Sequence, residues 1–211
     1  MKHSLKITIL LLVLTLQSFA QINPGARQVA LAHSDASYSN DVFQIFNNPA
    51  GLALAKSREV GMYYSPAPFD TKEMSNAFVA YCEPTQYGSF SAGFSIYGFE
   101  LYKETQFALG YGRKVTENFS IGGTALYKNL AIKNYGSKGT LLLNLGGIAT
   151  LNEQIGFGFA IENITRSSVS SESGQFPTVL WGGLHLKVVK EFTFSAALRK
   201  EVGYNPSIRI G

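Results

Sequence analysis

The sequence predicts an all-β protein: an antiparallel transmembrane β-barrel, incomplete in this chain, preceded by a short N-terminal helical segment. Three observations support this fold class. Apolar residues alternate with small or polar ones from about residue 59 onward, connections of different length alternate along the chain, and the composition suits a barrel wall. Glycine contributes 21 of the 211 residues and charged residues only 15%, whereas a typical soluble domain has roughly 25% charged residues.

Turn residues divide the second part of the chain into period-two runs that we interpret as strands. The expected strands are 59–65, 76–83, 89–98, 104–114, 119–130, 140–150, 155–163, 178–188 and 192–201, with a further start near Ser207. Residues 58–211 therefore form the expected barrel domain.

Within these runs, bulky apolar side chains are separated from small ones. Ile155, Phe157, Phe159 and Ile161 share one face of their run, while glycine and alanine share the other. The runs near residues 90 and 192 repeat this arrangement. A barrel in lipid needs apolar groups outside and small or polar groups inside. A soluble β-sandwich would show the same alternation with its apolar face turned inward, so the alternation alone leaves both folds open.

The lengths of the connections favour the membrane barrel. Short connections are expected at 84–88, 115–118, 151–154 and 189–191, and longer ones at 65–75, 99–103, 131–139 and 164–177. Short turns at one end and long loops at the other are typical of outer-membrane barrels.

Six tyrosines lie near expected strand ends. They are Tyr63, Tyr64, Tyr87, Tyr102, Tyr127 and Tyr135. Aromatic girdles at the two membrane interfaces would account for them, and so would the general preference of aromatic residues for strands.

Residues 1–20 have the pattern of a signal peptide. Lys2 and Lys6 form a positive region in front of an apolar stretch from Ile7 to Leu16, which is shorter than the roughly 20 residues of a spanning helix. Small residues at Ser18 and Ala20 provide a cleavage site, so we expect export to the outer membrane of a Gram-negative cell. Without the two lysines the net charge falls from +4 to about +2 with no basic cluster, and no nucleic-acid partner is expected.

Residues 21–57 differ from the expected strands. Alanine, serine and aspartate replace the alternating pattern, and residues 30–46 can form helical turns. Asn48-Pro49 is a turn signal, because the residue before a proline is pushed out of the helical region. A helical element with a fixed turn in front of the first strand fits a plug at one end of the barrel.

Several short motifs of this segment occur in a characteristic order. They are Gly25-Ala26-Arg27, Ala30, Asp41-Val42 and the run Phe46-Asn47-Asn48-Pro49-Ala50-Gly51-Leu52. This order resembles the N-terminal signature of the PorV/PorQ family, which belongs to a wider group of barrels similar to FadL. The family tends to have paired glycines where this chain has His33-Ser34. The resemblance implies a plug and turn motif built from Gly25, Ala26, Arg27, Asn48, Pro49, Ala50 and Gly51.

No pattern of residues indicates an enzyme, a metal site or a cofactor. His33 and His185 have no cysteine or carboxylate at metal-ligand spacing, Cys82 is the only cysteine, and no Gly-x-Ser-x-Gly motif occurs. The segment from Gly136 to Thr140 has the wrong order for a phosphate-binding loop. We therefore expect a protein that is not an enzyme.

Five charged or ionisable residues of the expected strands are candidates for lining the lumen or contacting a substrate. They are Lys128, Glu162, His185, Lys187 and Arg199. The alternative is that these residues are solvated charges at the ends of loops.

Two functions remain open, both with outer-membrane lipid around the wall. The resemblance to PorV/PorQ implies an accessory role in protein secretion of the type IX kind, with secretion proteins or cargo as partners. The wider FadL-like group implies passive uptake of hydrophobic small molecules through a plugged lumen. Because the last run stops at Gly211 soon after it begins, and bacterial barrels have even numbers of strands, we expect the sequence to be truncated.

Overall fold

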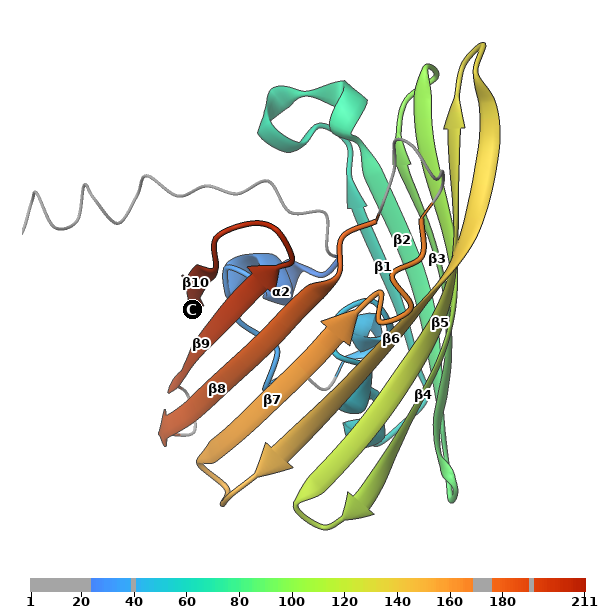
Figure 1. Cartoon of the computed structure of the whole chain (residues 1–211). Helices are drawn as coiled ribbons and strands as arrows, with labels where there is room; N and C mark the ends of the chain where they lie inside the picture. Colours follow the sequence, from blue (N-terminus) through green and yellow to red (C-terminus); the bar gives the residue numbers. More distant parts are fainter. Residues whose placement is uncertain (1–23, 39–40, 169–175, 190–191) are drawn as a thin grey trace, which may run out of the picture.

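The computed structural model describes residues 24–38, 41–168, 176–189 and 192–211. The predicted signal peptide lies outside these residues. Within them, ten strands form one sheet in chain order, so each strand pairs antiparallel with the strands next to it in the sequence, and β1 and β10 are its two edges. The all-β antiparallel architecture is confirmed (Figure 1).

The strands begin and end within a few residues of the expected positions in most cases. They are β1 (Glu59–Ser65), β2 (Asn76–Thr85), β3 (Gly88–Gly98), β4 (Tyr102–Thr116), β5 (Phe119–Ile132), β6 (Gly136–Thr150), β7 (Ile155–Glu162), β8 (Val179–Val189), β9 (Phe192–Glu201) and β10 (Ser207–Ile210).

Two connections that were expected to be long are short. The link predicted at 99–103 has three residues, because β4 already begins at Tyr102. The loop predicted at 131–139 is also a three-residue turn, because β5 and β6 stay paired up to Ile132 and Gly136. The polar residues 137–139 interrupt the apolar alternation, but the ladder consists of backbone hydrogen bonds and continues without it. The longest connections among the described strands, β1 to β2 and β7 to β8, still lie at the same end of the sheet (Figure 1).

The two faces of the curved sheet have opposite character. Small and polar residues such as Ser91, Gly110 and Ser195 lie on the concave face, whereas large apolar side chains are exposed on the convex face. The exposed set includes Phe90, Phe94, Phe107, Leu109, Tyr127, Leu141, Leu145, Phe157, Phe159, Leu184 and Leu198. A soluble sandwich would bury this face, so the distribution excludes that alternative.

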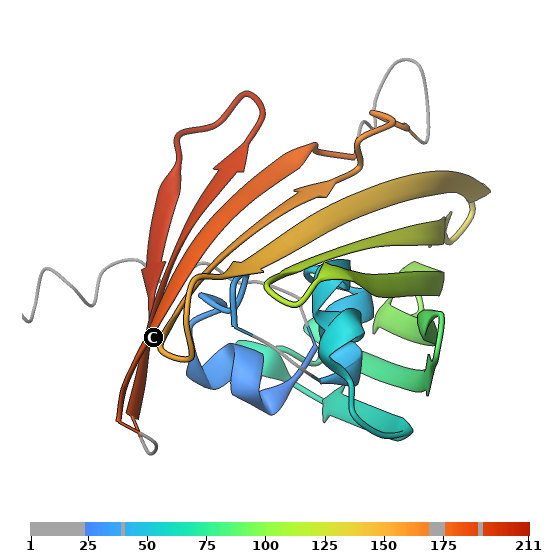
Figure 2. The ribbon, with the colours of Figure 1, turned by 90° about the horizontal axis from the view of Figure 1, so that it is seen from below.

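The N-terminal segment, residues 24–38 and 41–57, lies on the concave side of the sheet (Figure 2). It contains α2 (Ala26–Ala30) and two 3₁₀ turns, η1 (Val42–Ile45) and η2 (Pro49–Leu54). In the described residues no helix has the length and apolar character needed to cross a membrane. Two further 3₁₀ turns, η3 (Pro68–Asp70) and η4 (Lys72–Met74), occupy the connection from β1 to β2.

The expected helical turns over 30–46 are present only in part. The α-helix ends at Ala30, and the following Ala32 and His33 adopt left-handed backbone conformations with φ of 49° and 57°. Left-handed residues cannot continue an α-helix, and L side chains adopt this region at a cost.

Candidate functional site

Asn48 fixes the N-terminal segment to the sheet. Its side-chain oxygen accepts a hydrogen bond from the Ala50 N–H at 3.1 Å and caps η2. Its side-chain nitrogen donates to the backbone oxygen of Ala36 at 2.6 Å and to that of Gly147 on β6 at 3.3 Å. The Asn-Pro turn, recognised in the sequence as a local signal, therefore ties together three parts of the chain.

Glycines on the concave face provide the seat for this turn. A Cβ on Gly122 of β5 would overlap the backbone of Pro49, and one on Gly112 of β4 would lie 2.7 Å from the backbone nitrogen of Ala53. Backbone cannot move aside as a flexible side chain can, so only glycine permits this approach. We call this contact, made by η1 and η2 on β2 to β6, the apolar seat.

A buried apolar cluster completes the apolar seat. Val42, Ile45, Phe46 and Leu52 of the N-terminal segment pack against side chains of the strands. The strand residues of this cluster are Phe78, Ala80, Cys82, Ala108, Leu126 and Leu142. Burial of this many apolar groups stabilises the docked position of η1 and η2.

A cavity of about 390 Å³ lies between the N-terminal segment and the sheet. We call it the main cavity. Its apolar lining comes from Phe46, Phe78, Leu126, Leu142 and Phe176. Its polar lining includes Ser95, Tyr97, Glu104, Gln106, Lys128, Asn144, Glu162, Asn163 and Arg199. The volume lies in the range of small-molecule sites, and the lining combines an apolar floor with a comparable share of polar groups.

Three of the charged residues that line the main cavity, Lys128, Glu104 and Arg199, are in ion pairs, and the fourth, Glu162, accepts a hydrogen bond from Trp181. Lys128 and Glu104 form an ion pair with 2.6 Å between Nζ and Oε2, and both side chains are largely buried. The Lys128 ammonium also lies 4.5 Å from the ring centre of Phe176. On the other wall, Arg199 pairs with Glu201 at 2.9 Å. The cavity lining therefore carries no net charge that would select an anion or a cation.

Asn163 holds the two ends of the β7–β8 connection together. Its side chain donates to the backbone oxygen of Phe176 at 2.8 Å and accepts a hydrogen bond from the Ser167 N–H at 2.9 Å. Asn144 of β6 in turn accepts from the Asn163 N–H at 2.9 Å. This network places the Phe176 ring against the main cavity.

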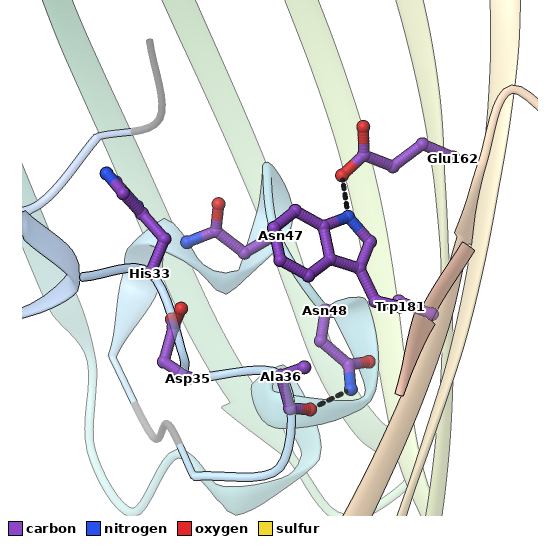
Figure 3. A pocket seen from close by; sticks show the side chains of 8 residues that line it. His33, Asp35, Ala36, Asn47, Asn48, Glu162 and Trp181 are labelled. Atoms are coloured by element: carbon purple, nitrogen blue, oxygen red, sulfur yellow. Dashed lines mark hydrogen bonds between the residues drawn. The ribbon is translucent and has the colours of Figure 1, made fainter. Parts of the chain in front are cut away.

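A second, smaller hollow lies deeper in the molecule (Figure 3). We call it the small pocket; its volume is about 10 Å³, which is about the space of one water molecule. It is lined by His33, Asp35, Ala36, Asn47, Asn48, Ala160, Glu162 and Trp181. The side chain of Asn47 has no hydrogen-bond partner in the described part of the chain although its polar atoms are buried.

Burial changes the acidity of two groups beside the small pocket. The pKa of Asp35 is raised to about 6, because burial disfavours its charged form more than the hydrogen bond from Gln44 restores it. The pKa of His33 is lowered to about 4 by burial and by the nearby positive charge of Arg209.

The structure divides the five predicted lumen residues into two groups. Lys128, Glu162 and Arg199 line the main cavity. His185 and Lys187 instead lie around Tyr38, with ring centres 4.9 Å apart for His185 and Tyr38 and the Lys187 ammonium 5.4 Å from the Tyr38 ring. All five belong to strands and none lies in a loop.

The seven residues of the expected plug and turn motif lie in two parts of the N-terminal segment. Gly25 precedes α2 with φ of 112°, a conformation that suits glycine, and Ala26 begins the helix. Arg27 lies 5.7 Å from the ring centre of Tyr38. Asn48, Pro49, Ala50 and Gly51 form the turn in the apolar seat.

Two of the tyrosines assigned to girdles show the limit of that interpretation. Tyr63 is on the concave side, where it packs against the apolar cluster, so it cannot belong to a girdle. Tyr135 is 88% exposed at the tip of the β5–β6 turn, beyond the end of the ladder. Tyr64, Tyr87 and Tyr127 are exposed on the outside of the sheet or at its turns.

Sequence reasoning missed four residues that shape the site: Glu104, Asn163, Phe176 and Trp181. Glu104 could have been found, because Gln106 is opposite Lys128 in the β4–β5 register and Glu104 is its neighbour on the same face. Trp181 is the only tryptophan of the chain and alternates with Val179 and Gly183. The other two act through the fold of a connection that has no local signal.

No protein-family model matches the chain, and no curated protein matches it. Among solved structures, the chain is similar to the CymD monoaromatic hydrocarbon channel with a TM-score of 0.61 and 10% sequence identity, over 92% of this chain and 76% of that one. At this identity the likeness concerns the fold alone. It agrees with the predicted FadL-like barrel fold, whereas the finer resemblance to PorV/PorQ is not confirmed.

Proposed function

We propose that the protein is an outer-membrane channel for small hydrophobic molecules, with the N-terminal segment as its plug. The main cavity carries this proposal. It borders the N-terminal segment at Phe46, and aromatic and aliphatic side chains from β2, β5 and β6 supply its floor. An uncharged apolar molecule of moderate size gains by leaving water for such a surface.

The convex face supports the location in a membrane. Rows of phenylalanine, leucine and tyrosine side chains are exposed there over successive strands. Contiguous apolar surface of this extent is costly in water and favourable in lipid. The likeness in fold to a hydrocarbon channel agrees with this proposal.

Uptake by intact cells tests the proposal. In the native organism, a strain without the gene is expected to take up radiolabelled toluene more slowly than the parent, and the intact gene should restore the rate. Leu142→Arg, which places a charge in the apolar floor, should fail to restore it. Lys138→Arg, near the tip of the same strand, is the control and should restore the rate. Equal uptake in parent and deletion strains would refute the channel.

A second candidate, an accessory role in protein secretion, rests on exposed aromatic residues at the end of the sheet with the long connections. Phe69 is 68% and Tyr135 is 88% exposed. Phe69 also has a left-handed backbone with φ of 57°. The same two strains decide between the candidates: loss of cargo secretion with unchanged toluene uptake would favour the accessory role, and the reverse result would favour the channel.

A further inference from the structure

Trp181 stands between the main cavity and the small pocket. Its indole N–H donates a hydrogen bond of 2.7 Å to Glu162, and Glu162 lines both hollows. Arg199, which lines the main cavity, lies 5.8 Å from the centre of the Trp181 ring. The ring itself lines the small pocket (Figure 3). The ring therefore lies next to groups of both hollows.

Among the described residues, the buried apolar neighbours of the ring are small. The buried cluster around Trp181 consists of Ala36, Ala160, Val179 and Ala197. At two neighbouring inward positions, on β7 and β8, the residues are Gly158 and Gly183. Because its neighbours are small, removal of the indole would leave a large void that these side chains cannot fill.

Polar groups hold the ring at its N–H edge and over its face. Glu162 accepts its N–H, and the guanidinium groups of Arg199 and Arg209 lie 5.8 and 5.1 Å from the ring centre. Cations at these distances are attracted to the indole face. These three contacts position the ring, whose buried apolar neighbours among the described residues are small.

The opposite side of the main cavity offers no comparable boundary. There Phe46, Leu126 and Leu142 belong to the apolar seat, which is continuous with the backbone contacts at Gly112 and Gly122. A molecule in the main cavity can therefore approach the loop His33–Ser37 more readily through the position of Trp181 than through the seat.

We propose that Trp181 is an internal gate that closes the main cavity toward the His33–Ser37 loop of the N-terminal segment. The gate determines how deeply a small aromatic or aliphatic molecule enters. This inference rests on the proposed channel function. Trp181→Gly joins the two hollows and leaves a space shaped for a flat aromatic ring, whereas Trp181→Phe keeps a ring in place and loses only the hydrogen bond to Glu162.

Binding of free indole tests the space itself. Both variants lack tryptophan, so the indole fluorescence that is measured comes from the added ligand. Indole should bind purified Trp181→Gly at least about tenfold more tightly than Trp181→Phe, because apolar voids bind small aromatic molecules. The double variant Phe159→Gly/Trp181→Phe removes a ring from the convex face of the neighbouring strand and should bind no better than Trp181→Phe. Equal binding by all three would overturn the proposal.

Uptake tests the gate. In the deletion strain, Trp181→Gly should take up toluene several times faster than the intact protein, and saturating indole should return the rate to that of the intact protein. Indole should leave Trp181→Phe unaffected. If the fast toluene uptake of Trp181→Gly persisted in the presence of saturating indole, the variant would have a general leak and the result would count against a gate. If the intact protein itself fails to restore uptake, the proposed channel is wrong; if it restores uptake and Trp181→Gly matches it with or without indole, the gate is wrong.

Discussion

The N-terminal segment meets the sheet in two contrasting ways. On β2 to β6, the apolar seat combines buried aliphatic and aromatic side chains with backbone contacts that only glycine permits. On β7 to β9, the backbone of Ala36 and Ser37 also lies against glycines, Gly158 and Gly183. The loop His33–Ser37, however, has small and polar side chains, and Ser37 Oγ and His33 Nδ1 have no hydrogen-bond partner among the described residues. The two contacts therefore differ mainly in their side chains, and we expect the polar contact to rearrange at a lower cost than the apolar seat.

The largest expected effect comes from the seat. Gly122→Val places a side chain where the backbone of Pro49 lies, and we expect it to destabilise the docked segment by about 3 kcal/mol or more. Trp181 emission should then shift to longer wavelength. Gly123→Val, one residue away on the convex face, would meet only Leu145 at 3.3 Å and the Asn144 oxygen at 3.6 Å. A similar shift in both variants would contradict the anchoring role.

Two adjacent asparagines sharpen the comparison. Asn48→Ala removes a helix cap and two buried hydrogen bonds, at an expected cost of about 2–4 kcal/mol. Asn47→Ala removes an amide that has no partner among the described residues and should change stability by only about 0.5 kcal/mol. Urea unfolding followed by Trp181 fluorescence measures both. Equal losses would show that the two contacts are energetically alike.

Acid should affect the small-pocket side in a defined direction. The folded-state pKa of Asp35, about 6, exceeds its ordinary value of 3.8. Protonation therefore favours the folded state as the pH falls through that range. Compared with Asp35→Asn, the intact protein should gain stability between about pH 7 and pH 5.

His33 opposes this effect, because its folded-state pKa of about 4 lies below its ordinary value of 6.5. Compared with His33→Gln, the intact protein should lose stability over the same interval. Urea unfolding of the three proteins at both pH values checks the signs. If the stability difference between the intact protein and each variant were the same at both pH values, neither group would be buried as described.

The smallest expected effect concerns the backbone after α2. Ala32 is exposed and has φ of 49°, so Ala32→Gly relieves the left-handed conformation. The greater freedom of glycine in the unfolded chain offsets part of the gain, leaving about 0.5 kcal/mol of stabilisation. A loss of stability in urea unfolding would contradict the assigned conformation.

Much of the fold could be predicted because its signals are local. The alternation of Phe157 and Phe159 with glycine indicates both a strand and its faces. The site depends on contacts between distant residues. The inward glycines indicate a tight interior, but nothing local shows that Gly122 accommodates Pro49, more than 70 residues earlier in the chain.

The positions of the five candidate lumen residues also depend in part on contacts between distant residues. Lys128 and Arg199 could be assigned to an inward face from alternation alone, but their division from His185 and Lys187 depends on where Tyr38 lies. Trp181 was overlooked because its importance comes from its small neighbours, which belong to four different segments.

Hydrogen exchange of the backbone amides tests the contrast between the two contacts most directly. In the intact protein, amides of Val42–Leu54, which include the Ala50 N–H bonded to Asn48, should exchange at least about a hundredfold more slowly than those of Leu31–Tyr38. Equal rates, or slower exchange in Leu31–Tyr38, would contradict the account of an anchored seat beside a loosely held loop.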